Sequence, residues 1–231
     1  MVLPIISQLL SRSRGRFATQ LGINLKSGAS PRQQWFLAAI LYGARISRAL
    51  AARTYGVFAA RGIYTPEAIL EQGWDNLVAL LDEGGYARYD FKTATKLLKV
   101  MAALKAEYQS SLEQLHREAR DYEDLEKRLR SLAPGMGEAT ANIFLRELRG
   151  VWAKATPPLS PLAQLAGEHL QLLGPGLSPW EALQVLEQQW QANPVPDYDF
   201  ADLEAALVRL GRDFCRKPHR RPCPMGDYCG R

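Results

Sequence analysis

The sequence predicts an all-α protein. Good helix formers (Ala, Leu, Glu, Gln, Arg and Lys) fill most of the 231 residues, and the alternating β-branched runs of half-buried strands are almost absent. Hydrophobic residues make up 47% of the chain and charged residues 23%, which is the composition of a globular protein with a packed core. No apolar run approaches the roughly 20 residues that a membrane-spanning helix needs, so we expect no membrane partner.

An amphipathic helix is expected at the N-terminus. Ile5, Ile6, Leu9 and Leu10 form its apolar stripe, which would dock on the rest of the protein. The Arg- and Ser-rich, acid-free composition of this segment also fits a mitochondrial transit peptide. We expect a cytoplasmic or nucleoid-associated protein, with targeting to an organelle as the alternative.

Prolines, glycines and N-capping residues divide the rest of the chain into amphipathic helical segments. Thr65 followed by Pro66 has the pattern of a helix N-terminus. The stretch DEGGYARYD, residues 82–90, interrupts the helical periodicity. Further helices are expected over residues 33–55, 91–108, 110–118, 122–132, 138–148, 162–173, 179–191 and 199–212.

A proline-rich stretch around residues 150–161 is the best candidate for a domain boundary. Gly150, Pro157, Pro158 and Pro161 interrupt helix within this short stretch. It separates a larger central block from a smaller C-terminal block.

The net charge of +5 is unevenly distributed along the sequence. Residues 1–30 hold four basic residues and no acid, and residues 212–231 hold six basic residues against two acids, so each end carries +4 and the remainder −3. Basic ends favour a partner with dense negative charge, and nucleic acid is the leading candidate. Solubilising tails are the alternative.

The stretch LAPGMGEATA, residues 132–141, predicts two helices joined by a tight loop. Pro134 ends the first helix, and Gly135 and Gly137 permit a tight turn and close approach to another molecule. The second helix begins near Glu138 with amide groups that lack intrahelical partners and with a partial positive charge, which together favour a phosphate. Such a loop binds the sugar-phosphate backbone and carries no sequence information.

The residues around the two glycines extend this candidate DNA-binding loop. Met136 between them is expected to be an apolar anchor or a groove contact, and Thr140 lies in the first turn of the second helix. A plain corner between two helices also uses a glycine pair, so the loop alone does not identify a nucleic-acid site.

The whole stretch resembles the helix-hairpin-helix (HhH) of the endonuclease III superfamily of DNA glycosylases, whose pattern is Leu-Pro-Gly-Val-Gly-Arg-Lys-Thr-Ala. The matching residues are Leu132, Pro134, Gly135, Gly137, Thr140 and Ala141, with Ala133 inserted before the proline.

The resemblance covers most of the chain and implies a two-domain, all-α fold. The first domain would be a six-helix barrel, residues 31–154, with the hairpin at 122–149. The second would be a helical domain formed by residues 1–30 together with 155–231 and ending in a cysteine loop, 215–229. The resemblance further implies double-stranded DNA as the partner of a monomeric protein in base excision repair.

The residues on which the family's chemistry depends are not found at the expected positions. In bifunctional members a lysine two residues after the second hairpin glycine attacks the sugar, and an aspartate at the domain crossing balances the developing positive charge. The resemblance places Ala139 at the lysine position and Thr156 at the aspartate position, with Ser160 if the alignment slips. Glu138 is the nearest remaining acid, and its place at a helix start favours capping over catalysis. The catalytic residues are therefore unknown.

All three cysteines fall in the tail CRKPHRRPCPMGDYC, residues 215–229, and an odd count argues against a simple disulfide framework. Cys215, Cys223 and Cys229 resemble the first, third and fourth ligands of the family's C-x6-C-x2-C-x5-C loop, which holds a [4Fe–4S] cluster. The second ligand should lie near Arg220, where there is no cysteine. His219 could complete four ligands for a cluster or for zinc, and a loop that has lost its metal is the alternative.

Basic residues lie between the cysteines and are expected to face DNA phosphates rather than base edges. They are Arg216, Lys217, Arg220 and Arg221.

Three functions stay open at this point. The first is a DNA-binding, damaged-base-recognising protein without the lyase step and without standard glycosylase activity. The second is a monofunctional DNA glycosylase with a relocated acid. The third is an interaction or redox module in which the C-terminal loop matters and the hairpin is structural.

Overall fold

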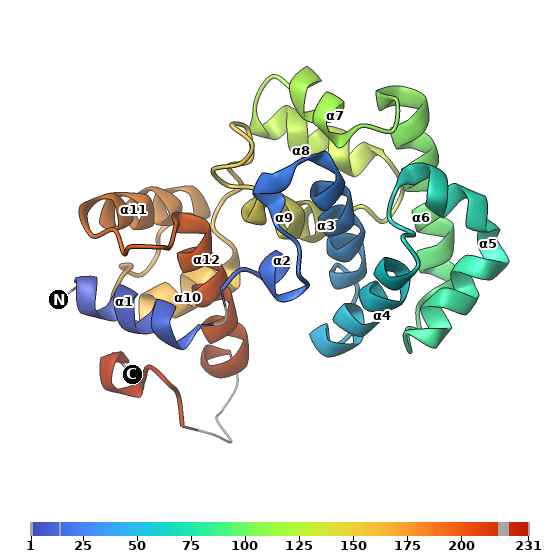
Figure 1. Cartoon of the computed structure of the whole chain (residues 1–231). Helices are drawn as coiled ribbons and strands as arrows, with labels where there is room; N and C mark the ends of the chain where they lie inside the picture. The colour runs from blue at the N-terminus through green and yellow to red at the C-terminus, as the bar shows by residue number, and fades with distance from the viewer. Residues whose placement is uncertain (1, 14, 217–221, 231) are drawn as a thin grey trace. The chain divides into compact units, whose positions relative to one another are not determined.

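The computed structural model describes residues 2–13, 15–216 and 222–230, and every regular element in these ranges is a helix (Figure 1). The all-α prediction is confirmed. Within the same ranges no helix has both the length and the apolar character needed to cross a membrane.

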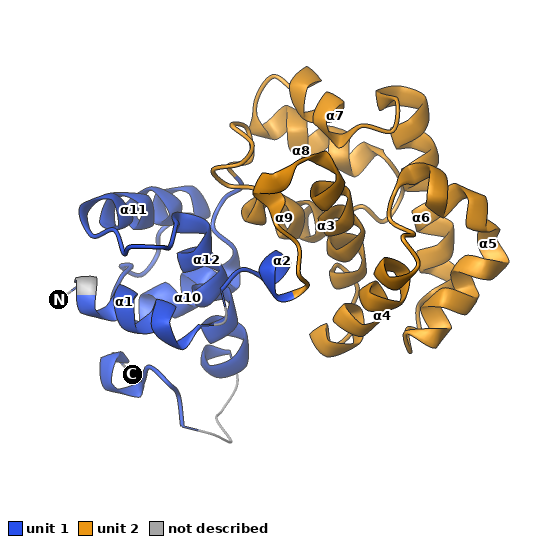
Figure 2. Ribbon diagram, in the orientation of Figure 1, with its two compact units in different colours: residues 1–20, 157–231 blue, residues 21–156 orange. Residues whose placement is uncertain are grey.

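The chain forms two compact units (Figure 2). Unit 1 combines Met1–Gln20 with Pro157–Arg231, and unit 2 is Leu21–Thr156. Unit 2 holds 19 basic and 15 acidic residues, a net charge of +4, which leaves +1 for unit 1. The two basic ends of the sequence thus share a unit with a compensating acidic segment.

Helix α3 (Ala29–Tyr42) forms the centre of unit 2. Its residues 35–41 are all buried, as expected for a helix that is apolar on every side. The other helices of the unit are α4 (Arg48–Ala60), α5 (Pro66–Glu83), α6 (Asp90–Tyr108), α7 (Leu112–Glu118), α8 (Tyr122–Ser131) and α9 (Glu138–Glu147). Helices α4, α7 and α9 pack against α3, and α5 packs along α6.

The N-terminal limit of unit 2 differs from the predicted domain boundary. The sequence predicts that residues 1–30 belong to the second domain, whereas in the structure the chain after Gln20 belongs to unit 2. The reason is that Ile23 and Leu25 are buried and the short 3-10 helix η1 (Leu25–Ser27) packs against α3.

Short polar side chains fix where most of the helices begin. In each case a side-chain oxygen accepts a hydrogen bond from a backbone amide in the first turn. These N-caps are Ser47, Thr65, Ser111, Asp121, Ser160, Ser178 and Asp199. The predicted start at Thr65 and Pro66 is confirmed.

The single helix predicted over residues 33–55 is wrong, because the structure divides it into α3 and α4. Gly43 is the C-cap of α3, and Ser47 is the N-cap of α4, with its hydroxyl accepting from the Leu50 amide at 3.2 Å. The apolar periodicity continues across residues 43–47 and hid both signals.

Unit 1 is built around α12 (Phe200–Leu210), most of which is buried. Its other elements are α1 (Val2–Arg12), α2 (Phe17–Gln20), α10 (Pro161–His169), α11 (Pro179–Ala192), the π-turn η2 (Gly211–Cys215) and η3 (Gly226–Tyr228). A Cβ on Gly211 would overlap the carbonyl oxygen of Leu162, so glycine allows the chain after α12 to meet α10.

Two helices of unit 1 end earlier than predicted. The helix expected to reach residue 173 ends at His169, because the amides of Leu172 and Leu173 both turn back to the Gly167 carbonyl oxygen. The helix expected to reach residue 212 ends at Leu210 and continues as the wider turn η2.

The N-terminal helix α1 docks on α12, as its apolar stripe predicts. Ile6, Leu9 and Leu10 are buried, and Ile5 is half-buried. The buried Arg16 forms an ion pair with Asp199, the N-cap of α12. The N-terminal segment is therefore part of the fold of unit 1.

Candidate nucleic-acid interface

The hairpin loop between α8 and α9 has the tight turn that its glycines predict. Helix α8 ends at Ser131, and the Met136 amide donates to the Ala133 carbonyl oxygen at 3.1 Å. Gly135 has a φ of +90°, which residues with a side chain rarely adopt. Gly137 is extended, with φ −86° and ψ 170°, and is the N-cap of α9.

The side chains of the loop separate into an inner and an outer set. Pro134, Gly135, Gly137, Glu138 and Ala139 are exposed. The inner set is buried and consists of Leu132, Ala133, Met136, Thr140 and Ala141.

Met136 is predicted to be an apolar anchor or a groove contact, and Thr140 is predicted to belong to the DNA-binding loop, but both side chains are buried. Met136 is 4% exposed and Thr140 is 3% exposed, so neither side chain reaches a ligand outside the protein. Their amides are also engaged, with Met136 donating to Ala133 and Thr140 to Gly137. Both residues shape the loop from within, and Met136 is the anchor rather than a groove contact.

Four amides on the outside of the loop are available to a ligand. Those of Gly135, Gly137, Glu138 and Ala139 take part in no hydrogen bond recorded for the described residues, and Gly137 supplies no side-chain cap. The first turn of a helix with unpaired amides carries a partial positive charge. The exposed face of this loop therefore presents donors and a positive potential, as an anion site requires.

Helix α9 is held firmly against α3, so the loop has a fixed place in unit 2. The Trp35 indole donates to the Phe144 carbonyl oxygen at 3.1 Å. The rings of Phe36 and Phe144 meet edge to face, with centroids 5.0 Å apart. At the start of α9, Thr140 lies directly against Gly43.

One basic side chain from another helix lies beside the loop. A Cβ built on Gly135 would be 3.5 Å from Cδ of Lys96, which is half-buried in α6. Lys96 precedes the hairpin by almost forty residues, so no local pattern in the sequence could have indicated this contact.

The solved structure of endonuclease III trapped as a covalent intermediate with DNA, an estranged-adenine complex, is similar to this chain. The similarity covers 84% of this chain and 82% of that one, with a TM-score of 0.51 and 19% sequence identity. This chain has the endonuclease III fold. No family model and no curated protein matches the sequence.

The positions that the resemblance to the endonuclease III superfamily assigns to catalysis hold no acid or amine. Ala139, at the lysine position, is exposed in the first turn of α9. Thr156, at the aspartate position, is also exposed. Ser160, the alternative, is the N-cap of α10 and accepts from the Ala163 amide. Glu138 is exposed at the start of α9, where a carboxylate favours the helix dipole.

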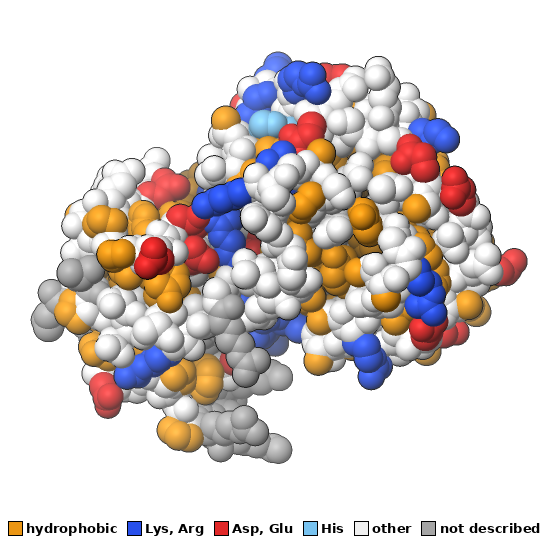
Figure 3. Space-filling model, viewed as in Figure 1, with side chains coloured by type: hydrophobic (Ala, Val, Ile, Leu, Met, Phe, Trp, Pro, Cys, Tyr) orange, Lys and Arg blue, Asp and Glu red, His pale blue; other side chains and the backbone are white. Residues whose placement is uncertain are grey.

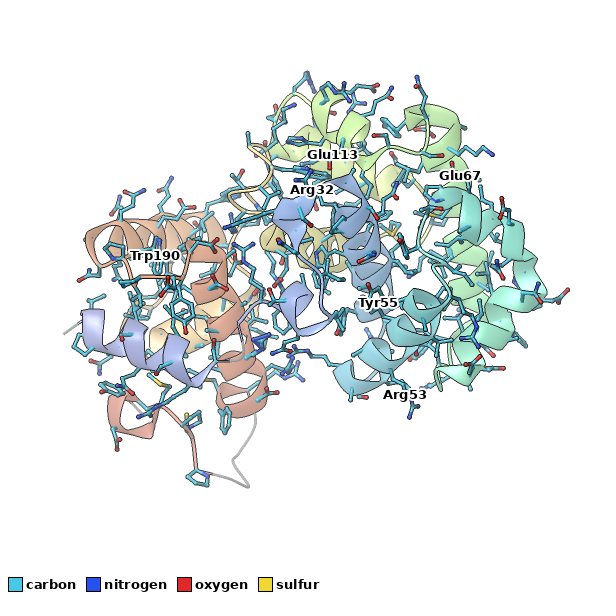
Figure 4. The ribbon with its side chains drawn as sticks, viewed as in Figure 1. Arg32, Arg53, Tyr55, Glu67, Glu113 and Trp190 are labelled. Carbon is cyan, nitrogen blue, oxygen red and sulfur yellow. The ribbon has the colours of Figure 1, made fainter. Side chains whose placement is uncertain are left out.

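The segment that leads to Thr156 is fixed by a polar cluster within unit 2. The Trp152 indole donates to Glu113 at 3.0 Å, and Glu113 pairs with Arg32 at 2.7 Å (Figure 4). The Lys154 amine donates to the carbonyl oxygens of His116 and Arg117 at 2.8 and 3.1 Å. These bonds attach the segment after α9 to α3 and α7.

His116 lies face to face with Trp152 in the same cluster, with ring centroids 4.6 Å apart and an angle of 7° between the rings. Its Nε2 is buried and makes no hydrogen bond to any described residue. Burial, followed by the charge of Lys154, lowers the pKa of His116. The neutral ring is therefore the form that this packing favours.

The cysteine tail belongs to unit 1. Cys215 is buried at the end of η2, Cys223 and Cys229 are half-buried, and all three are free thiols. Arg216 is exposed. The predicted residues Lys217, His219, Arg220 and Arg221 lie outside the described residues. In the described part of the chain, no three cysteine, histidine or acidic side chains come together as a metal-binding group.

Met225 anchors the last part of the tail and is fully buried. The Arg12 guanidinium donates to the Pro224 carbonyl oxygen, and the Gly230 amide donates to the His169 carbonyl oxygen at 2.8 Å. The segment around Cys223 and Cys229 is therefore attached to α1 and α10 by protein contacts.

Proposed function

We propose that this chain is a duplex-DNA-binding protein of the endonuclease III superfamily that recognises damaged bases without the family's standard lyase chemistry. The observation that carries the proposal is the outward-facing set of unengaged amides at the hairpin between α8 and α9. The similar solved structure is that of an endonuclease III trapped on DNA, which supports DNA as the anion. The positive net charge of unit 2 supports the same partner.

In this function the residue at position 139 takes no part in the usual covalent step. A Schiff base needs an amine, and Ala139 presents a methyl group. Thr156 brings no negative charge to an oxocarbenium-like transition state, and a charge preorganised at such a place is worth on the order of 3 kcal/mol or more. The residues at positions 139 and 156 therefore lower the rate of base removal and strand cleavage, and they leave DNA binding intact.

Contacts to phosphates position a protein on DNA and carry no base information. On the face of unit 2 drawn in Figure 3, basic and acidic side chains are interspersed rather than gathered into one basic patch. In this function the hairpin supplies affinity through phosphate contacts, and other surfaces of a monomeric protein recognise the damaged base.

A metal in the cysteine tail is a separate proposal. A [4Fe–4S] cluster or a zinc ion would take Cys215, His219, Cys223 and Cys229 as ligands. The three described thiols form no ready-made metal-binding group, so no part of the DNA-binding proposal passes through a metal. Anaerobic purification with metal analysis tests this proposal, and we expect one cluster or one zinc ion per chain. Protein that purifies without metal, and whose stability does not change when iron or zinc is added, contradicts the proposal.

The proposed function is tested with a panel of duplexes, each carrying one damaged base, and the matching undamaged duplex. We expect tighter binding to at least one damaged duplex and no strand scission, with or without alkali. Scission that appears only after alkali would instead identify a monofunctional glycosylase. Binding to no duplex at moderate salt would contradict both functions.

A further inference from the structure

The Lys96 side chain lies beside Gly135 of the hairpin loop. Its Cδ would lie 3.5 Å from a Cβ on Gly135, which is ordinary van der Waals contact, and its amine is one methylene further along. Gly135 is exposed and has a φ of +90°. Helix α6 therefore delivers a cation to the loop whose outer amides are unengaged.

Lys96 has no counter-ion in the described part of the chain, where no ion pair or hydrogen bond to it is recorded. Two arginines of α8 differ from Lys96 in this respect. Arg128, in the helix that leads into the loop, pairs with Asp124 at 3.2 Å and with Glu118 at 3.3 Å. Arg130 pairs with Glu126 at 3.4 Å. These two arginines of α8 are thus paired within the protein, and the amine beside Gly135 is not.

Burial makes this unpaired charge costly. Desolvation lowers the pKa of Lys96, and among the described residues no acidic neighbour opposes the shift. A half-buried ammonium group without a partner is stabilised when an anion approaches it. A ligand with negative charge at the loop would offset the cost of burying this ammonium group.

We propose that Lys96 is a phosphodiester-binding residue of the hairpin and contacts the DNA backbone segment held by the loop amides. This inference rests on the proposed DNA-binding function. It assigns to α6 the cation that the hairpin sequence itself lacks, since Glu138 and Ala139 occupy the first turn of α9.

The test compares Lys96→Met with Lys105→Met in duplex binding measured over a range of salt concentrations. Methionine keeps an unbranched chain against Gly135 and removes the charge. Lys105 lies in the last turn of the same helix and is exposed, so its replacement removes the same charge about two and a half helical turns along α6 from Lys96. We expect Lys96→Met to lower affinity about tenfold and to reduce the salt dependence by about 0.9 units of slope. Lys105→Met should change neither quantity.

A second measurement uses the unmodified protein. Acetylation of lysine amines, read by mass spectrometry, should be slower at Lys96 when duplex DNA is bound and unchanged at Lys105. If the wild-type protein binds duplex DNA but Lys96 and Lys105 behave alike in both experiments, this inference is wrong. Failure of the wild-type protein to bind duplex DNA would instead overturn the proposed function, so the two failures are distinguishable.

Discussion

Gly43 at the end of α3 and Thr140 in the first turn of α9 are in such close contact that no larger residue fits at position 43. A Cβ there would overlap the Thr140 hydroxyl oxygen and would lie 3.2 Å from the Thr140 Cβ. Thr140 is buried, so it has little room to move away. This contact joins the central helix of unit 2 to the helix that follows the hairpin loop.

Gly43→Ala should destabilise the protein by about 1–3 kcal/mol, the usual cost of overpacking a core. Thr140→Ala removes the atom that the new methyl group meets first, so the double variant should be more stable than the sum of the two single effects predicts. Chemical denaturation of the four proteins measures this coupling. Additive effects would show that the two residues are not in contact.

Gly137→Val should abolish most DNA affinity and leave the fold unchanged. Gly137 is extended, and a Cβ there meets no atom within 4 Å, so valine fits without strain. Its methyl groups would cover the unengaged amides. Loss of hydrogen bonds to a charged group, about 1.5–3 kcal/mol each, predicts a loss of more than tenfold.

The matched control is Gly56→Val in α4, where a Cβ also meets no atom within 4 Å and the residue is exposed. It should bind DNA like the wild type, and thermal melting should confirm that both variants are folded. Wild-type affinity in Gly137→Val would remove the hairpin from the proposed function.

The parts of the fold that the sequence predicted are those with local signals. Pro134, Gly135 and Gly137 predicted the hairpin because turn geometry depends on the residues of the turn themselves. Thr65 predicted a helix start for the same reason. The similar solved structure agrees with the all-α fold that these signals suggested.

The parts that the sequence did not predict depend on contacts between distant residues. Lys96 lies beside the hairpin although almost forty residues separate it from Gly135, and Met225 of the cysteine tail is fully buried. The inward direction of Met136 also depends on the space that the neighbouring helices leave. Such relationships are set by packing, which periodicity alone does not specify.

His116 predicts a dependence of stability on pH. Its pKa in the folded protein is lowered below the usual value of about 6.5. As the pH falls, this histidine therefore binds a proton in the unfolded chain before it does so in the folded protein. The contribution of His116 to the free energy of unfolding is complete above the unfolded pKa, and it decreases as the pH falls from there towards the folded pKa. Arg32, Glu113 and Lys154 are the charged groups that act on the ring.

His116→Phe keeps an aromatic ring against Trp152 and removes the titration. Between about pH 8 and about pH 5, the range in which histidine changes charge, the free energy of unfolding should fall more in the wild type than in this variant. Denaturation at several pH values measures the difference. Identical pH profiles would show that His116 is protonated equally in both states.

Ala139→Lys tests whether the exposed first turn of α9 faces the sugar of bound DNA. The wild type has no amine at this position, whereas the variant can add its amine to the aldehyde carbon of an abasic site, with loss of water, to form a Schiff base. Borohydride reduction should therefore trap a covalent complex between the variant and an abasic duplex, and none with the wild type. Glu138→Lys places an amine one residue earlier in the same exposed turn, so it is the control for position and should trap much less. If Ala139→Lys binds the abasic duplex and gives no trapped complex, then position 139 does not face the sugar, and the correspondence with the family's lysine is wrong.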